Sequence, residues 1–139
     1  MRYLLDTCVL SDFINGDLGT LQKLKSISPA SICLSTVTVS EIYYGFSQYP
    51  DKAAQLKSVL ESFLKGVSIV PFEWGDAEVS ARVKASLTKA GKNIGSCDTL
   101  IAGTALKRGL ILVTSNTPIF EEIPGLELEN WRQVSGFQL

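Results

Sequence analysis

Short apolar runs alternate along the chain with segments whose apolar residues recur at helical spacing. The runs fall at residues 3–5, 31–35, 67–70 and 110–114, and a weaker one falls at 126–128. Each run is short enough for a strand, and the segments between them are long enough for crossover helices. This alternation is typical of parallel sheets covered by helices. We therefore predict an α/β fold with three layers, α/β/α, around a central, mostly parallel sheet.

The clearest helix is predicted over residues 51–65, where Leu56 and Leu60 belong to one apolar stripe. We expect Asp51 to cap its start and Gly66 to end it. Further helices are predicted over residues 9–15, 19–27, 76–90 and 96–108, and we expect Ser96 to cap the last of them. One more helix carries residues 41–46 and follows candidate caps at Thr36 and Thr38. Thr117 and Pro118 open a short helical turn.

Length and composition favour one globular domain. The chain has 139 residues, of which 45% are hydrophobic and 19% are charged, with a mean hydropathy of +0.19. We therefore expect a single domain over residues 1–139. No apolar run approaches the length of a membrane span, and the N-terminus does not have the pattern of a secretion signal. We thus expect a cytoplasmic protein that does not enter the membrane.

The absence of histidine restricts the chemistry that the chain can perform. Ser/His/Asp and Cys/His catalysis and most zinc sites depend on an imidazole, so they are excluded. Cys8, Cys33 and Cys97 show no paired spacing, and we expect small buried side chains. The formal net charge of −1 gives no overall basic footprint for nucleic acid, so any such binding must rest on a local site.

Three acids occupy comparable positions in the predicted fold. Asp6 follows the first apolar run, Glu41 lies shortly after the second, and Asp98 lies in the first turn of a predicted helix. Because the carboxyl ends of parallel strands meet at one edge of the sheet, these acids can converge there. Clustered carboxylates either take up protons or share a cation, and Mg²⁺ prefers oxygen ligands. The pattern predicts a site for a hard divalent cation such as Mg²⁺, suited to hydrolysis of a phosphodiester.

Each candidate also has a purely structural interpretation. Asp6 can cap a helix, Glu41 can be a solvated helix residue, and Asp98 can complement a helix dipole. Thr114 and Asn116 follow the strongest predicted strand, where they can position water or phosphate, but an ordinary turn explains them equally well. We include Asn116 with the three acids as a candidate catalytic residue.

Four segments, in order along nearly the whole chain, resemble VapC-type PIN-domain proteins. They are Leu4-Leu5-Asp6-Thr7, Ser40-Glu41-Ile42, the run IGSCDTLIA at residues 94–102, and a C-terminal stretch from LVTSN at 112–116 to PGLELENW at 124–131.

This resemblance implies a PIN fold and a Mg²⁺- or Mn²⁺-dependent endoribonuclease that acts as the toxin of a type II toxin-antitoxin pair. It also implies an RNA substrate and a homodimer. Neutralisation would come from a cognate VapB-like antitoxin, a small DNA-binding protein whose C-terminal segment covers the acidic groove. Asp6, Glu41 and Asp98 match the acidic metal site of the family's pattern.

The chain departs from the family's pattern at two positions. Cys8 stands where Asn usually follows the leading Asp-Thr, and we expect it to remove a polar group beside the site. Ile119 stands where a fourth acid often precedes the Phe of the final motif, here Phe120. A second metal ion would then be weak or absent, Asn116 or Glu121 would compensate, or activity would be low; the sequence leaves these outcomes open.

Two other functions remain open. A PIN domain made degenerate by Ile119 would bind RNA or an antitoxin without cutting. A small phosphohydrolase or nucleotide-binding protein ranks last, because Asp6-Thr7-Cys8 lacks the second acid of an Asp-x-Asp motif and no glycine-rich phosphate loop occurs.

Three groups of residues could lie on the surface, and two of them could contact a partner or RNA. Of the four clustered aromatic residues, we expect at least half to pack in the core. We expect most of the five basic residues to be solvated, and at least one of two glutamates near the C-terminus to be exposed. The aromatics, for a dimer or antitoxin surface, are Tyr43, Tyr44, Phe46 and Tyr49; the basic residues, for an RNA groove, are Lys89, Lys92, Lys107, Arg108 and Arg132; the acids are Glu121 and Glu122.

Overall fold

Five short strands build the central sheet of the protein. The structure, a computed structural model, describes residues 2–132. All strand pairs in this part of the chain are parallel, and the strand order is β3-β2-β1-β4-β5. The strands are β1 (Tyr3–Leu5), β2 (Ile32–Ser35), β3 (Ser68–Val70), β4 (Ile111–Val113) and β5 (Leu128–Glu129).

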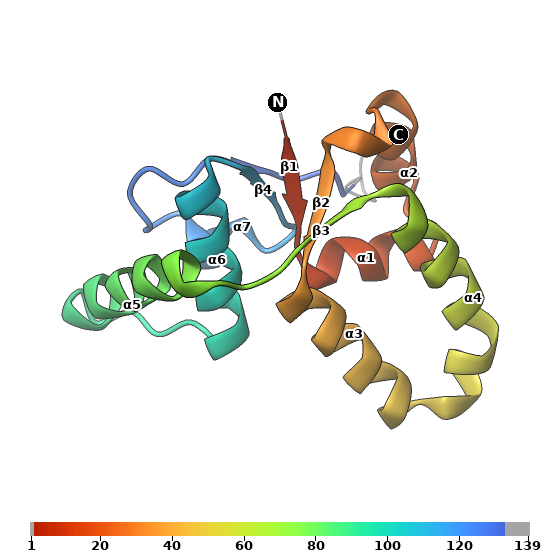
Figure 1. Cartoon of the computed structure of the whole chain (residues 1–139), viewed down its shortest axis with the longest axis horizontal. Coiled ribbons are helices and arrows are strands. Elements are labelled where there is room, and N and C mark those ends of the chain that lie inside the picture. The colour runs from red at the N-terminus through yellow and green to blue at the C-terminus, as the bar shows by residue number, and fades with distance from the viewer. Residues whose placement is uncertain (1, 133–139) are drawn as a thin grey trace, which may run out of the picture.

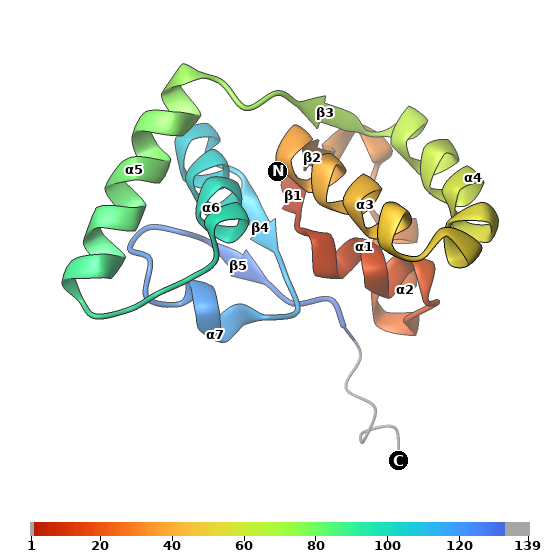
Figure 2. The same cartoon turned by 90° about the horizontal axis from the view of Figure 1, so that it is seen from below.

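Helices cover both faces of this sheet (Figures 1 and 2), which confirms the predicted three-layer α/β/α fold. One layer contains α5 (Trp74–Lys89), α6 (Ser96–Arg108) and the short α7 (Thr117–Phe120); the other contains α1 (Thr7–Ile14), α2 (Leu18–Ser26), α3 (Thr36–Gln48) and α4 (Pro50–Gly66). A single 3₁₀ turn, Pro29–Ser31, leads into β2.

Alternation along the strands supplies both layers with apolar contacts. In β1, Leu4 packs into a cluster with residues of α5 and α6, whereas Leu5 packs into a second cluster with residues of α1, α3 and α4. In β4, Leu112 and Val113 divide between the same two clusters. Successive strand residues point to opposite faces, so a sheet buried on both faces reads as a short continuous apolar run.

The register of the central strands brings their carboxyl ends level. Leu5 pairs with Leu34 of β2 and with Val113 of β4. The residue after each of these strand ends therefore lies at the same edge of the sheet, and the backbone N–H of Asp6 donates to the carbonyl of Val113 at 3.1 Å. Parallel pairing on both sides of β1 thus places Asp6 at the middle of this edge.

Several helix starts differ from the sequence prediction. Ser35, not Thr36 or Thr38, caps α3, and its hydroxyl accepts from the N–H of Val37 at 3.0 Å. Tyr49 precedes α4 because Pro50, which lacks an N–H, fits the first helical position; Asp51 lies in the first turn instead.

The other boundary differences are smaller. Gly95 precedes α6, so Ser96 is its first residue instead of its cap. Helix α5 begins at Trp74, two residues before the predicted start, because the Asp76 carboxylate accepts from the N–H of Glu73 at 2.8 Å and closes its first turn. The last strand is β5 at Leu128–Glu129, shifted from the predicted 126–128.

Helices α5 and α6 pack closely and are joined by an ion pair between the buried Asp76 and the more exposed Arg108. A Cβ atom at Gly103 would lie 1.9 Å from the hydroxyl oxygen of Ser80, so only glycine permits this approach. Arg108 donates to both carboxylate oxygens of Asp76, at 3.1 and 2.8 Å. Burial alone would raise the pKa of Asp76, but the Arg108 and Glu73 hydrogen bonds and the charge of Arg108 hold it below its usual value. The pair fixes α6, and with it the position of Asp98.

Candidate active site

Asp6 is both a helix cap and a buried acid at the edge of the sheet. It is 4% exposed, and its Oδ1 accepts from the backbone N–H of Val9 at 3.2 Å, which caps α1. Burial raises the pKa of the Asp6 carboxyl, while hydrogen bonds from Cys8, Thr114 and Val9 act in the opposite direction. The structural role expected for Asp6 is therefore real, but a cap does not require such burial.

Asp98 lies in the first turn of α6 and is partly buried. Its pKa is raised first by burial and then by the negative charges of Asp6 and Glu41. These two acids are far away in sequence, so their effect on Asp98 shows that the fold brings all three into one electrostatic neighbourhood.

Glu41 projects from α3 and is held by residues next to the other two acids. The hydroxyl of Thr7, which follows Asp6, donates to Glu41 Oε1 at 2.5 Å. Glu41 also acts on Cys97, the residue before Asp98. Burial raises the pKa of the Cys97 thiol, and the charge and hydrogen bonding of Glu41 raise it further. Glu41 is thus tied to α1 and α6 at once, which a solvated helix residue would not be.

The donors at this edge suit a hard divalent cation. The three acids offer only oxygen atoms, and burial together with the negative charges of Asp6 and Glu41 disfavours ionisation of Asp98 without a counter-charge. Within residues 2–132, no three acidic or cysteine side chains converge tightly enough to enclose an ion by themselves. Mg²⁺ does not need such a cage, because it retains several waters and binds through one or two carboxylates plus substrate phosphate.

Asn116 stands in the loop between β4 and α7. Its side chain is exposed, and its backbone N–H donates to the buried hydroxyl of Thr114 at 3.0 Å. Nothing in the described part of the chain joins the Asn116 side chain to the three acids by a hydrogen bond or ion pair. A catalytic role for Asn116 therefore stays a prediction.

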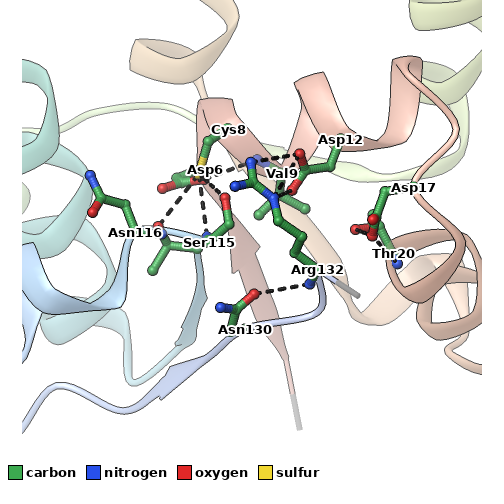
Figure 3. Close-up of polar contacts among 11 residues, drawn as sticks. Asp6, Cys8, Val9, Asp12, Asp17, Thr20, Ser115, Asn116, Asn130 and Arg132 are labelled. Atoms are coloured by element: carbon green, nitrogen blue, oxygen red, sulfur yellow. Dashed lines mark hydrogen bonds and ion pairs between the residues drawn. The ribbon is translucent and has the colours of Figure 1, made fainter. Parts of the chain in front are cut away.

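Cys8 does not remove polar contacts from the site, which corrects the expectation from the sequence. Its thiol contacts Asp6 and Ser115 (Figure 3), at 2.9 Å from Asp6 Oδ1 and 3.0 Å from the hydroxyl oxygen of Ser115. Cysteine spacing alone gave no sign of this, because Ser115 reaches the thiol only through the pairing of β1 with β4.

Ile119 faces the core instead of the acids. Its partly buried side chain packs against the cluster that contains Leu112 and Phe120. Glu121 and Glu122 are both exposed, and Glu122 forms a surface ion pair with Lys92 at 3.5 Å. The expectation that at least one of these glutamates is an exposed charge is confirmed.

Among the basic candidates, Arg132 is paired with an acid of α1, the helix that Asp6 caps. Arg132 forms a two-pronged ion pair with Asp12 of α1, with a closest distance of 2.8 Å, and the hydrogen bonds to Asp12 raise the pKa of its guanidinium. Sequence reasoning missed Asp12, whose only signal was an acid in an apolar helix. Arg108 is engaged by Asp76 and Glu73, and Lys107 lies against Gly75.

The aromatic cluster is more exposed than the sequence indicated. Tyr44 and Tyr49 are 67% and 66% exposed, and Tyr43 is also exposed. Only Phe46 packs partly against the core, so the expectation that half of these residues are buried is wrong. Tyr49 and Phe46 instead line a groove between α1, α3 and α4 that also contains Glu41 and Lys52.

A five-stranded parallel sheet covered by helices on both faces is the architecture of a PIN domain. Residues 3–126 match the PIN domain family. The chain belongs to this family.

Within this family, the chain is similar to VapC ribonucleases, as the sequence motifs predicted. The chain is 35% identical over 133 residues to "Ribonuclease VapC2" of Haemophilus influenzae and 31% identical over 133 residues to "tRNA(fMet)-specific endonuclease VapC" of Shigella flexneri. Each alignment covers 94% of this chain and 98% of the relative. A structure of VapBC2 from Rickettsia felis bound to a promoter DNA fragment superposes with a TM-score of 0.87 at 32% identity, covering 94% of this chain and 99% of that one.

No helix in the described residues is both long and apolar enough to cross a membrane.

Removing the charge of Asp98 should stabilise the metal-free protein. An acid whose pKa is raised by folding lowers stability above that pKa, and this cost vanishes as the pH falls below the unfolded value, about 4. In chelator at pH 7, Asp98→Asn should raise the free energy of unfolding, because the charge that folding disfavours is gone. Urea denaturation at pH 7 and below pH 4 measures the gain and its loss.

Asp51→Asn is the matched control, because Asp51 also lies in a first helical turn but is exposed. It should give no gain. A loss of stability in Asp98→Asn at both pH values would contradict the electrostatic account.

Proposed function

We propose that the chain is a metal-dependent endoribonuclease that acts as the toxin of a type II toxin-antitoxin pair. The observation that carries the proposal is the placement of Asp6 at the carboxyl edge of the sheet, next to Thr7, whose hydroxyl donates to Glu41 of α3. The names of the VapC relatives support the reaction, hydrolysis of RNA. We further propose that the chain forms one PIN domain over residues 1–139.

Asp6 and Asp98 would hold Mg²⁺ or Mn²⁺, with Glu41 as a third ligand directly or through water. The bound ion would supply charge for the phosphodiester oxygens and lower the pKa of an attached water. Glu41 is fixed by the Thr7 hydroxyl, so its carboxylate is suited to orient the attacking water. Burial of Asp6 strengthens its interaction with any cation, because the surrounding dielectric is low.

RNA would be drawn to the site by local charge. The net charge of −1 gives no long-range attraction, and two of the basic candidates, Lys92 and Arg108, are paired with acids elsewhere. Arg132 lies beside Cys8 and retains donor capacity after pairing with Asp12, so we propose that it contacts a phosphate of the substrate. Such a contact positions the strand without reading its sequence.

Replacing either buried acid should abolish RNA cleavage without unfolding the protein. Asp6→Asn and Asp98→Asn each remove a charged oxygen ligand but keep the side-chain volume, and Asn also caps helices well. We expect cleavage of structured RNA in Mg²⁺ or Mn²⁺ to fall by at least about 100-fold, as for loss of a main electrostatic contributor. Gel analysis of the fragments and circular dichroism measure activity and fold.

Glu78→Gln, an exposed acid on α5, should cleave like the wild type. Chelator should stop both active proteins. Cleavage by Asp6→Asn and Asp98→Asn at the wild-type rate would refute the nuclease. Folded wild-type protein that never cuts would instead indicate an RNA- or antitoxin-binding module.

We propose a VapB-like antitoxin as the partner of this chain and a homodimer as its assembly. The R. felis structure that it resembles is a VapBC2 complex bound to promoter DNA. The groove between α1, α3 and α4 offers apolar side chains beside Glu41, with Lys52 at its margin. A segment of antitoxin seated there would pack apolar residues and cover the acids.

Tyr49 and Tyr44 test this surface directly. Both are about equally exposed on the same region, but only Tyr49 lines the groove. Tyr49→Ala should weaken the complex with the antitoxin encoded beside this gene by about 10-fold, since buried Tyr anchors at interfaces exceed 1 kcal/mol. Calorimetric titration gives the dissociation constants. Tyr44→Ala should bind like the wild type, and equal weakening by both variants would place the partner elsewhere.

A further inference from the structure

The thiol of Cys8 joins two segments that are more than a hundred residues apart in sequence. It lies in the first turn of α1, with Asp6 Oδ1 at 2.9 Å. On its other side, the hydroxyl and the backbone N–H of Ser115 donate to the sulfur at 3.0 and 3.3 Å. Figure 3 shows the sulfur between Asp6 and Ser115.

The direction of these hydrogen bonds follows from the chemistry of a thiol. A cysteine has one S–H donor and a weakly accepting sulfur. The Ser115 N–H can only donate, so the sulfur accepts there and its own proton is directed at the Asp6 carboxylate. The chain of contacts therefore runs from the loop after β4, through Cys8, to Asp6.

Asp6 Oδ1 accepts from the thiol and also from the backbone N–H of Val9 at 3.2 Å. Two donors on one oxygen fix the rotation of the carboxylate about its Cα–Cβ and Cβ–Cγ bonds. A third contact places the Thr114 hydroxyl 3.5 Å from the same sulfur, and that hydroxyl accepts from the N–H of Asn116. The orientation of Asp6 is thus coupled to the loop between β4 and α7.

We propose that Cys8 is a positioning residue of the metal site, whose thiol orients the Asp6 carboxylate toward the cation and links it to the loop that begins at Thr114. This inference rests on the proposed function, because it assumes that Asp6 binds the metal. Cys8 itself is not a ligand in this account. It acts on the cation through Asp6, as hydrogen-bonded neighbours of metal ligands commonly do.

Substitutions at Cys8 separate orientation from packing. Cys8→Ala removes the donor to Asp6 and leaves the Ser115 groups without their acceptor. Cys8→Ser keeps one donor and an acceptor in nearly the same volume. Cys33→Ala is the matched control, because Cys33 is fully buried in β2 and its loss creates a core cavity away from the acids.

The measurement is Mn²⁺ binding to the full chain, followed by calorimetry or by the signal of free Mn²⁺ in electron paramagnetic resonance. Cys8→Ala should raise the Mn²⁺ dissociation constant by about 10- to 100-fold, the usual effect of losing an outer-shell partner. Cys8→Ser should restore it to within about threefold of the wild type. Cys33→Ala should lower the melting temperature and leave Mn²⁺ affinity unchanged.

The kinetics of RNA cleavage give a second measurement, which a simple packing defect would not change in the same way. At limiting Mn²⁺, Cys8→Ala should lower kcat for RNA cleavage and leave the KM for RNA unchanged, and excess Mn²⁺ should recover part of the rate. Wild-type Mn²⁺ affinity in Cys8→Ala would overturn the inference, as would an equal loss of affinity in Cys33→Ala. If wild-type protein neither binds Mn²⁺ nor cuts RNA, the proposed function fails first, which is a distinguishable result.

Discussion

Parallel pairing of β1 with neighbours on both sides is the constraint on which the site depends. The register that sets Leu5 beside Leu34 and Val113 makes β1 and β4 end level with one another, and β2 continues one residue further, to Ser35. Asp6 then emerges at the centre of that edge, where α3 and α6 start close to it. A slip of one residue would exchange the two faces of β1 and move Leu4 and Leu5 into the wrong clusters. Core packing and site geometry are therefore specified by the same pairing.

Placing acids at this edge lowers the stability of the metal-free protein, and the stability of the rest of the fold offsets this loss. Burial and neighbouring negative charge both disfavour ionised Asp98, and burial disfavours ionised Asp6. Elsewhere a buried acid is compensated, since Arg108 neutralises Asp76 where α5 meets α6. No comparable cation faces Asp6, Glu41 and Asp98 in the contacts of residues 2–132, which is the condition expected of a site that acquires its counter-charge from a bound ion.

The sequence was sufficient for the layers and for the order of the elements, because each leaves a local signal. Apolar runs marked the strands, and an acid after a run marked the edge of the sheet. Helix starts were less predictable, since Pro50 and the N–H of Glu73 decide them through backbone geometry. The contacts of Cys8 and of Arg132 could not be read at all, because their partners are brought near only by the folded sheet. The exposure of Tyr44 and Tyr49 was missed for a related reason: their spacing fits a core as well as a partner surface.

The central claim is that the three acids share one electrostatic site. Carbon-detected NMR titration of the Asp98 carboxyl, in metal-free wild type and in Asp6→Asn, measures this most directly. The account predicts that the pKa of Asp98 is raised in the wild type and falls toward the ordinary aspartate value when the charge of Asp6 is removed. An Asp98 pKa that is the same in both proteins would contradict it.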